Sequence, residues 1–194
     1  MTEHVGPGTQ PRIALCLEQT LGHRTHGQNI ERALDARGID AARIAVHPPA
    51  RRALPIPWAL RSSFDAARQL RALGRMDVTF FHTQTLSLFA SLATRGTPYV
   101  VSVDATPAQI DDMGMWYEHG RHQAPLESAK RSWYRRVLTR SAGIVTWSAW
   151  AAESLRADYG VRFAGEADQR GAVGAGARDV DVPATPRLLV AHPG

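Results

Sequence analysis

Cysteine is nearly absent from this chain of 194 residues, in which Cys16 is the only one. A single cysteine excludes an internal disulfide and fits a reducing compartment such as the cytoplasm. Because Cys16 lies in an apolar stretch, we expect its thiol to be an inert part of the core. Long apolar runs are missing too, since none approaches the roughly 20 residues that a membrane span needs. Residues 1–11 lack the layout of a signal peptide and are expected to form a flexible N-terminus.

Lysine is equally scarce, because Lys130 is the only lysine among 23 basic residues and arginine supplies the rest. The formal net charge of +5 would suit nucleic acid, an anionic membrane or a phosphorylated ligand. The sequence has no recognisable nucleic-acid-binding motif and no interleaving of aromatic and basic residues of the RNA-binding kind. We therefore expect no nucleic-acid partner.

The common motifs of catalysis and cofactor binding are also missing. The sequence has no P-loop, no Gly-x-Ser-x-Gly elbow, no His-Glu-x-x-His and no paired cysteines. A dinucleotide site would carry Gly-x-Gly-x-x-Gly after the first apolar stretch, but Gly22 and Gly27 stand too far apart there. We expect no cofactor and no metal. Residues 18–27 are expected to form a polar loop. Backbone amides near Gly27 could still face an anion at the start of the following helix, and an ordinary polar loop without a ligand is an equally good interpretation.

What the sequence does contain is a regular alternation of apolar, strand-like stretches and helical stretches. The expected strands cover residues 12–17, 44–46, 77–81, 99–103 and 142–147. The expected helices cover residues 28–37, 58–75, 86–94, 126–140 and 150–159. This order predicts one α/β domain over residues 12–161, with an open, mostly parallel sheet and helices on both faces. Residues 162–194 lack periodicity, apart from a strand-like stretch at 188–191, and are expected to be a poorly ordered tail.

Residues 77–109 form the central strand–helix–strand unit, and polar side chains follow both of its strands. His82 and Thr83 come directly after the first of these strands, and Asp104 follows the second. Ligands of parallel sheets bind beyond the carboxyl ends of the strands, so we expect these residues to share one edge. Asp104 could be a general base or accept a hydrogen bond from a sugar hydroxyl, or it could cap a local turn. His82 could contact a ligand or only bond to the backbone, and Ser148 is expected to cap a helix.

Two further stretches could meet a partner. Arg61, Arg68, Arg71 and Arg75 fall in one sector of the expected helix 58–75. This sector is either a solvated face or a basic patch for anionic lipid or a phosphorylated acceptor. We accordingly expect a cytoplasmic protein that could also contact the inner face of the membrane. Residues 110–125 are rich in aromatic residues and histidine and are expected to form an irregular segment that lines a site or docks a partner.

Several stretches together resemble the N-terminal half of a glycosyltransferase of family 4, a family with the GT-B fold. The resemblance covers Arg12 to Val161. It rests on the glycine-containing segment 22–34, on Phe81-His82-Thr83-Gln84-Thr85, on residues 101–107, and on residues 143–150 followed by Ser154-Leu155 and by Asp158-Tyr159-Gly160-Val161. The last of these runs is the most specific, because family members commonly carry a serine and then Tyr-Gly at that spacing.

The resemblance implies a Rossmann-like domain on the acceptor side of a retaining enzyme that moves a sugar from a nucleotide-sugar to an acceptor hydroxyl. Asp104 stands where many relatives carry a histidine, and we expect it to be the catalytic residue. The residues expected to bind the acceptor, which would be a sugar or a lipid-linked compound, are Gly22, His26, Gly27, His82, Thr83 and Ser148.

Relatives continue into a donor-binding domain after the position of Val161, and this sequence does not. We therefore expect a truncated enzyme that would bind its nucleotide-sugar only with the missing domain and would be inactive as an isolated chain. The alternative is a non-catalytic Rossmann-like module for binding or regulation.

Overall fold

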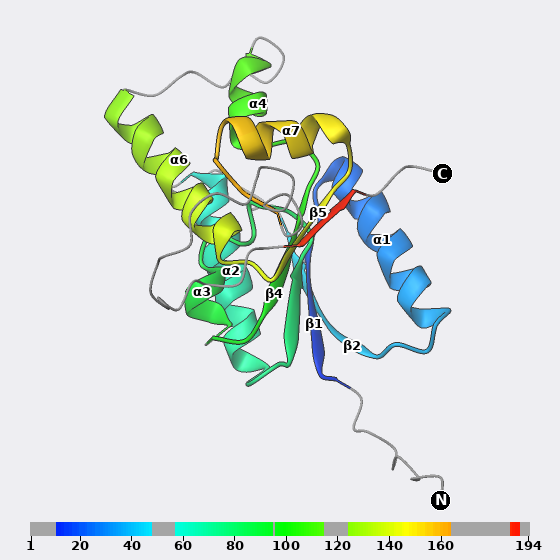
Figure 1. Cartoon of the computed structure of the whole chain (residues 1–194). Helices are drawn as coiled ribbons and strands as arrows, with labels where there is room; N and C mark the ends of the chain where they lie inside the picture. Colours follow the sequence, from blue (N-terminus) through cyan, green and yellow to red (C-terminus); the bar gives the residue numbers. More distant parts are fainter. Residues whose placement is uncertain (1–10, 48–56, 95, 115–123, 164–186, 191–194) are drawn as a thin grey trace, which may run out of the picture.

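The computed structural model describes residues 11–47, 57–94, 96–114, 124–163 and 187–190. They form one sheet of six parallel strands in the order β2-β1-β3-β4-β5-β6 (Figure 1). The strands are β1 (Ile13–Glu18), β2 (Ala41–Val46), β3 (Val78–Phe81), β4 (Tyr99–Val103), β5 (Gly143–Thr146) and β6 (Arg187–Val190). The helices are α1 (Leu21–Asp35), α2 (Trp58–Ala72), α3 (Ala90–Ala93), α4 (Pro107–Asp112), α6 (Ala124–Thr139) and α7 (Ala149–Ala157). The expected open parallel α/β sheet is confirmed.

The order of the strands decides which helix covers which face. The chain steps from β1 outward to β2 in one direction and from β3 to β6 in the other. Right-handed crossovers then place the helix between β1 and β2 on the opposite face from the later helices. Figure 1 shows α1 on one side of the sheet, with α2, α3 and α6 on the other.

The main core lies between the sheet and the helices opposite α1. Cys16, Phe81, Val101 and Ile144 point to this side and are at most 1% exposed. Burial raises the pKa of the Cys16 thiol to about 12, in agreement with the expectation of an inert core residue. Within the residues that the structure describes, no helix has the length and apolarity needed to cross a bilayer.

The largest difference from the sequence-based expectation lies between the first two strands. Residues 18–27 were expected to be a polar loop, but α1 already begins at Leu21. The two glycines suggested a loop because glycine weakens helices by about 1 kcal/mol. Neither Gly22 nor Gly27 has a positive φ, so both are ordinary helical residues here. Packing of this turn against the strand ends therefore outweighs the low helix propensity.

Smaller differences concern the segments around β4 and the end of the chain. Residues 86–89 form turns, so that only α3 remains of the helix expected over 86–94, and α4 occupies the start of the segment expected to be irregular. Thr106 caps α4 reciprocally with Gln109, a capping box that the sequence analysis missed. The strand-like stretch near residue 188 is indeed β6. Residues 1–10, 48–56, 115–123, 164–186 and 191–194 lie outside the described part, so the expectations for both termini and for most of the aromatic segment stay predictions.

Candidate functional site

Five side chains meet at the carboxyl edge of the sheet, and we call them the histidine cluster. They are His23 and His26 from α1, His82 after β3, Asp104 after β4 and Trp147 after β5. Parallel strands end at the same edge, which is why residues distant in the sequence converge there. The prediction that His82 and Asp104 share one edge is confirmed.

The cluster is held by direct contacts between its rings. His26 Nδ1 lies 2.7 Å from His82 Nε2, and the two rings stack with centroids 4.9 Å apart. The His26 ring also packs on Trp147 at a centroid distance of 3.9 Å. His23 meets His82 edge to face at 5.6 Å, and its Nε2 lies 3.7 Å from Asp104 Oδ2. Asp104 is thereby connected through His23 to the other two histidines.

Burial keeps the inner part of the cluster uncharged. His82 is 1% exposed, and desolvation, followed by repulsion from His26 and His23, lowers its pKa to about 3. The pKa of His26 is lowered by desolvation and by His23, while Asp104 acts in the opposite direction. His82 is therefore a neutral imidazole near pH 7. Its Nδ1 and that of His23 are buried and have no hydrogen-bond partner in the described part of the chain, which leaves two ring nitrogens of the cluster unsatisfied.

A buried carboxylate supports the cluster from below. Glu18, at the end of β1, is 5% exposed and accepts hydrogen bonds of 2.7 Å from the hydroxyls of Thr20 and Thr83. Thr20 is the residue that precedes α1, and Thr83 directly follows His82. Glu18 therefore fixes the start of α1, which carries His23 and His26, relative to the end of β3. We call these three residues the Glu18 clasp.

The residues expected to bind the acceptor differ in their surroundings. His26 and His82 belong to the histidine cluster. Gly22 is exposed in the first turn of α1, with nothing within 4 Å of a Cβ placed there. Gly27 is buried against His82. Thr83 serves the Glu18 clasp instead of facing solvent.

Ser148 is the expected N-cap of α7. Its hydroxyl oxygen accepts a hydrogen bond from the Ala151 N–H, 3.1 Å away. It lies next to the cluster residue Trp147 in the chain, but its oxygen already has a structural role.

The sequence analysis did not select His23, Glu18 or Trp147 as site residues. His23 and His26 are three residues apart, and this spacing places both on one face only if the segment is helical. Reading residues 18–27 as a loop therefore hid the pair. Trp147 is oriented by a hydrogen bond of 2.7 Å from its Nε1 to Ser102 Oγ on the neighbouring strand. That contact depends on the register between β4 and β5, which the sequence alone does not reveal.

An apolar cavity of about 690 Å³ lies beside the cluster, on the face of the sheet that carries α1. Side chains from four strands line it, Leu15, Phe80, Val100 and Val145 among them, and His26 and Trp147 also contribute. The last two residues belong to both features, so the histidine cluster adjoins the cavity. The open edge of the sheet thus combines polar groups with an apolar wall.

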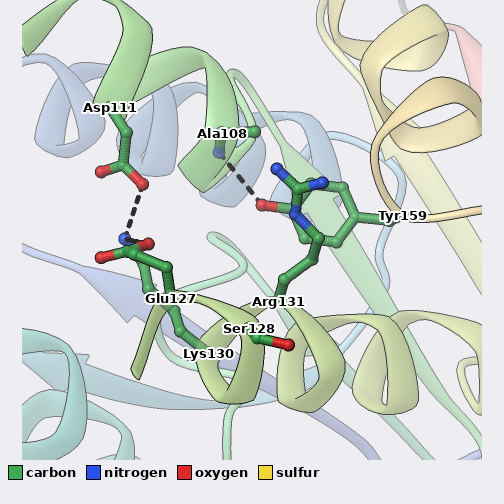
Figure 2. A pocket seen from close by; sticks show the side chains of 7 residues that line it. All are labelled: Ala108, Asp111, Glu127, Ser128, Lys130, Arg131 and Tyr159. Carbon is green, nitrogen blue, oxygen red and sulfur yellow. Dashed lines mark hydrogen bonds and ion pairs between the residues drawn. The ribbon is translucent and has the colours of Figure 1, made fainter. Parts of the chain in front are cut away.

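A second hollow, of about 260 Å³, lies where α4, α6 and the residue Tyr159 meet (Figure 2). The single lysine, Lys130, reaches Asp111 at 2.8 Å and Glu127 at 3.6 Å. The Ala108 N–H donates to the Tyr159 hydroxyl at 3.0 Å. Because two carboxylates already surround the ammonium group, we interpret this hollow as the junction that fixes α4 to α6.

No set of three or more metal-binding side chains in the described part of the chain is arranged to hold an ion. The cluster histidines contact one another and Trp147 instead of converging on a point.

The Glu18 clasp leads to a prediction about stability. Glu18→Ala should lower the free energy of unfolding by about 2 kcal/mol, because two hydroxyls lose a charged hydrogen-bond acceptor. Glu18→Gln should be nearly neutral, since it keeps one acceptor and removes a buried charge. Urea unfolding measures both. Glu153→Ala, at an exposed position of α7, is the matched control and should stay within about 0.5 kcal/mol of the parent. An unchanged stability in Glu18→Ala would contradict the clasp.

The buried imidazole of His82 predicts a dependence of stability on pH. Its pKa is about 3 in the native state against 6.5 in an unfolded chain, so between these values the unfolded state binds more protons. The stabilisation is complete above pH 6.5 and declines as the pH falls toward 3, by up to about 1.4 kcal/mol per pH unit. His82→Gln should remove this part of the slope in urea unfolding at several pH values, whereas His47→Gln, at an exposed histidine, should not. An NMR titration of His82 with a midpoint near the ordinary value would refute the prediction.

Comparison with known proteins gives the chain a family. A family model described as glycosyl transferase 4-like domain matches residues 14–167, which include every residue of the histidine cluster and the Glu18 clasp. A search of curated proteins finds no match. The family match covers most of the described sheet, and its limits coincide closely with those of the resemblance found in the sequence. This chain belongs to the glycosyl transferase 4-like domain family.

Proposed function

We propose that this chain is the acceptor-side domain of a retaining hexosyltransferase of the GT-B type. Membership of the family implies a sugar donor and an acceptor in general. The finer assignment, that this domain holds the acceptor hydroxyl and a second domain holds the nucleotide-sugar, is our proposal. It is supported by the chemistry of the histidine cluster.

The observation that carries the proposal is the pair formed by His23 and Asp104 at the rim of the cluster. Both side chains are partly exposed, at 24% and 32%, whereas His82 behind them is buried. Where a carboxylate and an imidazole lie 3.7 Å apart, the carboxylate can accept a hydrogen bond from one hydroxyl of a sugar and the imidazole can donate one to a neighbouring hydroxyl. Neither lysine nor arginine belongs to the cluster. The rim therefore suits a hydroxyl-bearing acceptor better than the diphosphate of a nucleotide.

Each part of the cluster has a separate role in this proposal. Asp104 accepts a hydrogen bond from the acceptor hydroxyl and orients its oxygen, which makes it the catalytic residue. His23 contacts the same sugar and is held in place by His82 and Asp104. His26 and His82 position His23 and Trp147 and do not themselves exchange a proton. Retention requires the hydroxyl to approach from the face that the donor phosphate leaves, so the donor must lie across the rim from Asp104.

The experiment measures transfer and binding separately with the full chain. We expect no transfer of labelled glucose or mannose from UDP-glucose or GDP-mannose by the chain alone. Saturation-transfer NMR should nevertheless detect binding of one or more methyl hexosides. Asp104→Asn should weaken that binding by about tenfold or more, because a charged hydrogen bond is lost.

Asp40→Asn, at an exposed position between α1 and β2, is the control and should leave hexoside binding unchanged. Transfer by the isolated chain would refute the assignment to the acceptor side. Hexoside binding that is indifferent to Asp104 would favour the alternative, a non-catalytic binding module.

Gly22 gives a second test, in which stability and binding should change in opposite directions. It is helical, so Gly22→Ala should raise the free energy of unfolding by about 0.5–1 kcal/mol. The added methyl group would occupy open space next to His23, where the acceptor is proposed to lie, and should weaken hexoside binding by about tenfold. Thr25→Ala, at an exposed position on the outer face of α1, should stabilise the helix without affecting binding. Unchanged binding in Gly22→Ala would place the acceptor elsewhere.

A further inference from the structure

Helix α2 departs from the usual amphipathic pattern, although its Leu70 packs in the main core. Small residues cover most of its buried face, namely Ser62, Ser63, Ala66 and Ala67. Its phenylalanine, Phe64, points outward and is 65% exposed, and Leu60 is 43% exposed. A helix whose only task is to cover a sheet turns its large apolar residues toward the core. The outward phenylalanine and leucine therefore indicate a second contact for this helix.

The exposed apolar residues continue onto the neighbouring elements. Leu92 of α3 is 58% exposed and Trp133 of α6 is 48% exposed. The elements are tied together locally, since Ser63 Oγ accepts from the Phe89 N–H at 2.9 Å and Trp133 Nε1 donates to the Leu88 carbonyl at 2.9 Å. Figure 1 shows α2, α3 and α6 together on the side of the molecule away from α1. We call Leu60, Phe64, Leu92 and Trp133 the outer apolar patch.

Arginines are interleaved with this patch. Arg61, Arg68 and Arg71 lie on the same exposed sector of α2 as Leu60 and Phe64, and Asp65 is the only acidic residue of the helix. Asp65 pairs with Arg68 at 2.9 Å. Arg71 donates to the Leu92 carbonyl at 3.3 Å, and no ion pair in the described part of the chain uses Arg61 or Arg71. The patch therefore keeps an uncompensated positive charge beside its apolar residues.

We propose that the outer apolar patch and Arg61 and Arg71 form a surface that binds an anionic lipid bilayer. Aromatic and aliphatic side chains enter the boundary between headgroups and acyl chains, while neighbouring arginines attract anionic headgroups. The charge argues against self-association, because a symmetric dimer through this surface would bring the same arginines of two copies together. This inference does not rest on the proposed sugar-transfer function, which uses other residues at the carboxyl edge of the sheet.

Sedimentation with vesicles tests the proposal on the full chain. The chain should bind vesicles of mixed phosphatidylcholine and phosphatidylglycerol, bind pure phosphatidylcholine far more weakly, and lose binding as salt is added. Arg61→Gln with Arg71→Gln should weaken binding about 25-fold, at about fivefold for each arginine. Phe64→Ser with Leu92→Ser should weaken it about tenfold or more, since two apolar side chains no longer enter the bilayer. All four positions are exposed, so circular dichroism should show an unchanged fold.

Two matched controls distinguish binding through this surface from non-specific adsorption to vesicles. Trp150→Ser removes a tryptophan that is 50% exposed on α7, outside the patch. Arg32→Gln with Arg37→Gln removes two exposed charges at α1, on the other side of the sheet. Both controls should bind vesicles like the parent chain. The proposal would be overturned if the controls lost as much binding as the patch variants, or if the chain bound neutral vesicles equally well. It would also be overturned if the parent chain were an oligomer and Phe64→Ser with Leu92→Ser made it a monomer, because the patch would then be a protein interface.

Discussion

A buried carboxylate that has no cationic partner among the described residues fixes the edge of the sheet on which the candidate site is built. Two threonine hydroxyls are the hydrogen-bond partners that Glu18 has in the described part of the chain. Removing a carboxylate from water costs several kcal/mol, and neutral hydroxyls compensate only part of this cost. What Glu18 achieves is a fixed geometry, because it joins β1, the start of α1 and the end of β3 at one point. The relative position of His23, His26 and His82 follows from that junction.

The parallel sheet explains both the site and the uneven cover of its two faces. Strand ends at one edge bring His82, Asp104 and Trp147 together, and the handedness of the crossovers sends α1 to the face opposite α2, α3 and α6. Helices α2, α3 and α6 cover the opposite face, where Phe81 and Val101 are buried, whereas Phe80 and Val100 stay partly exposed and line the cavity of about 690 Å³. The same topology therefore produces a closed core and an open apolar wall next to the polar cluster.

The sequence predicted those features that depend on local pattern and on general rules of parallel sheets. Both ends of strand β4 were predicted correctly, because its run of β-branched residues is bounded by Pro98 on one side and by Asp104 on the other. The meeting of His82 with Asp104 followed from the strand-end rule. The Glu18 clasp and the contact of Trp147 with Ser102 did not, because they depend on side-chain contacts between segments distant in the chain. The prediction placed the start of α1 seven residues too late because of the two glycines, whereas tertiary packing there outweighs their low helix propensity.

The two proposed surfaces differ in charge, and the partners proposed for them differ accordingly. Near neutral pH the buried His82 imidazole is uncharged, and Asp104 is the one acidic residue of the cluster, so the rim presents hydrogen-bonding groups without concentrated positive charge. In the proposed function, such a rim suits hydroxyls, which can both donate and accept hydrogen bonds, better than phosphate. The arginines that make the chain basic include Arg61 and Arg71 of the outer surface, where an anionic bilayer would compensate them. The basic character of this chain is therefore no argument that the histidine cluster binds a nucleotide.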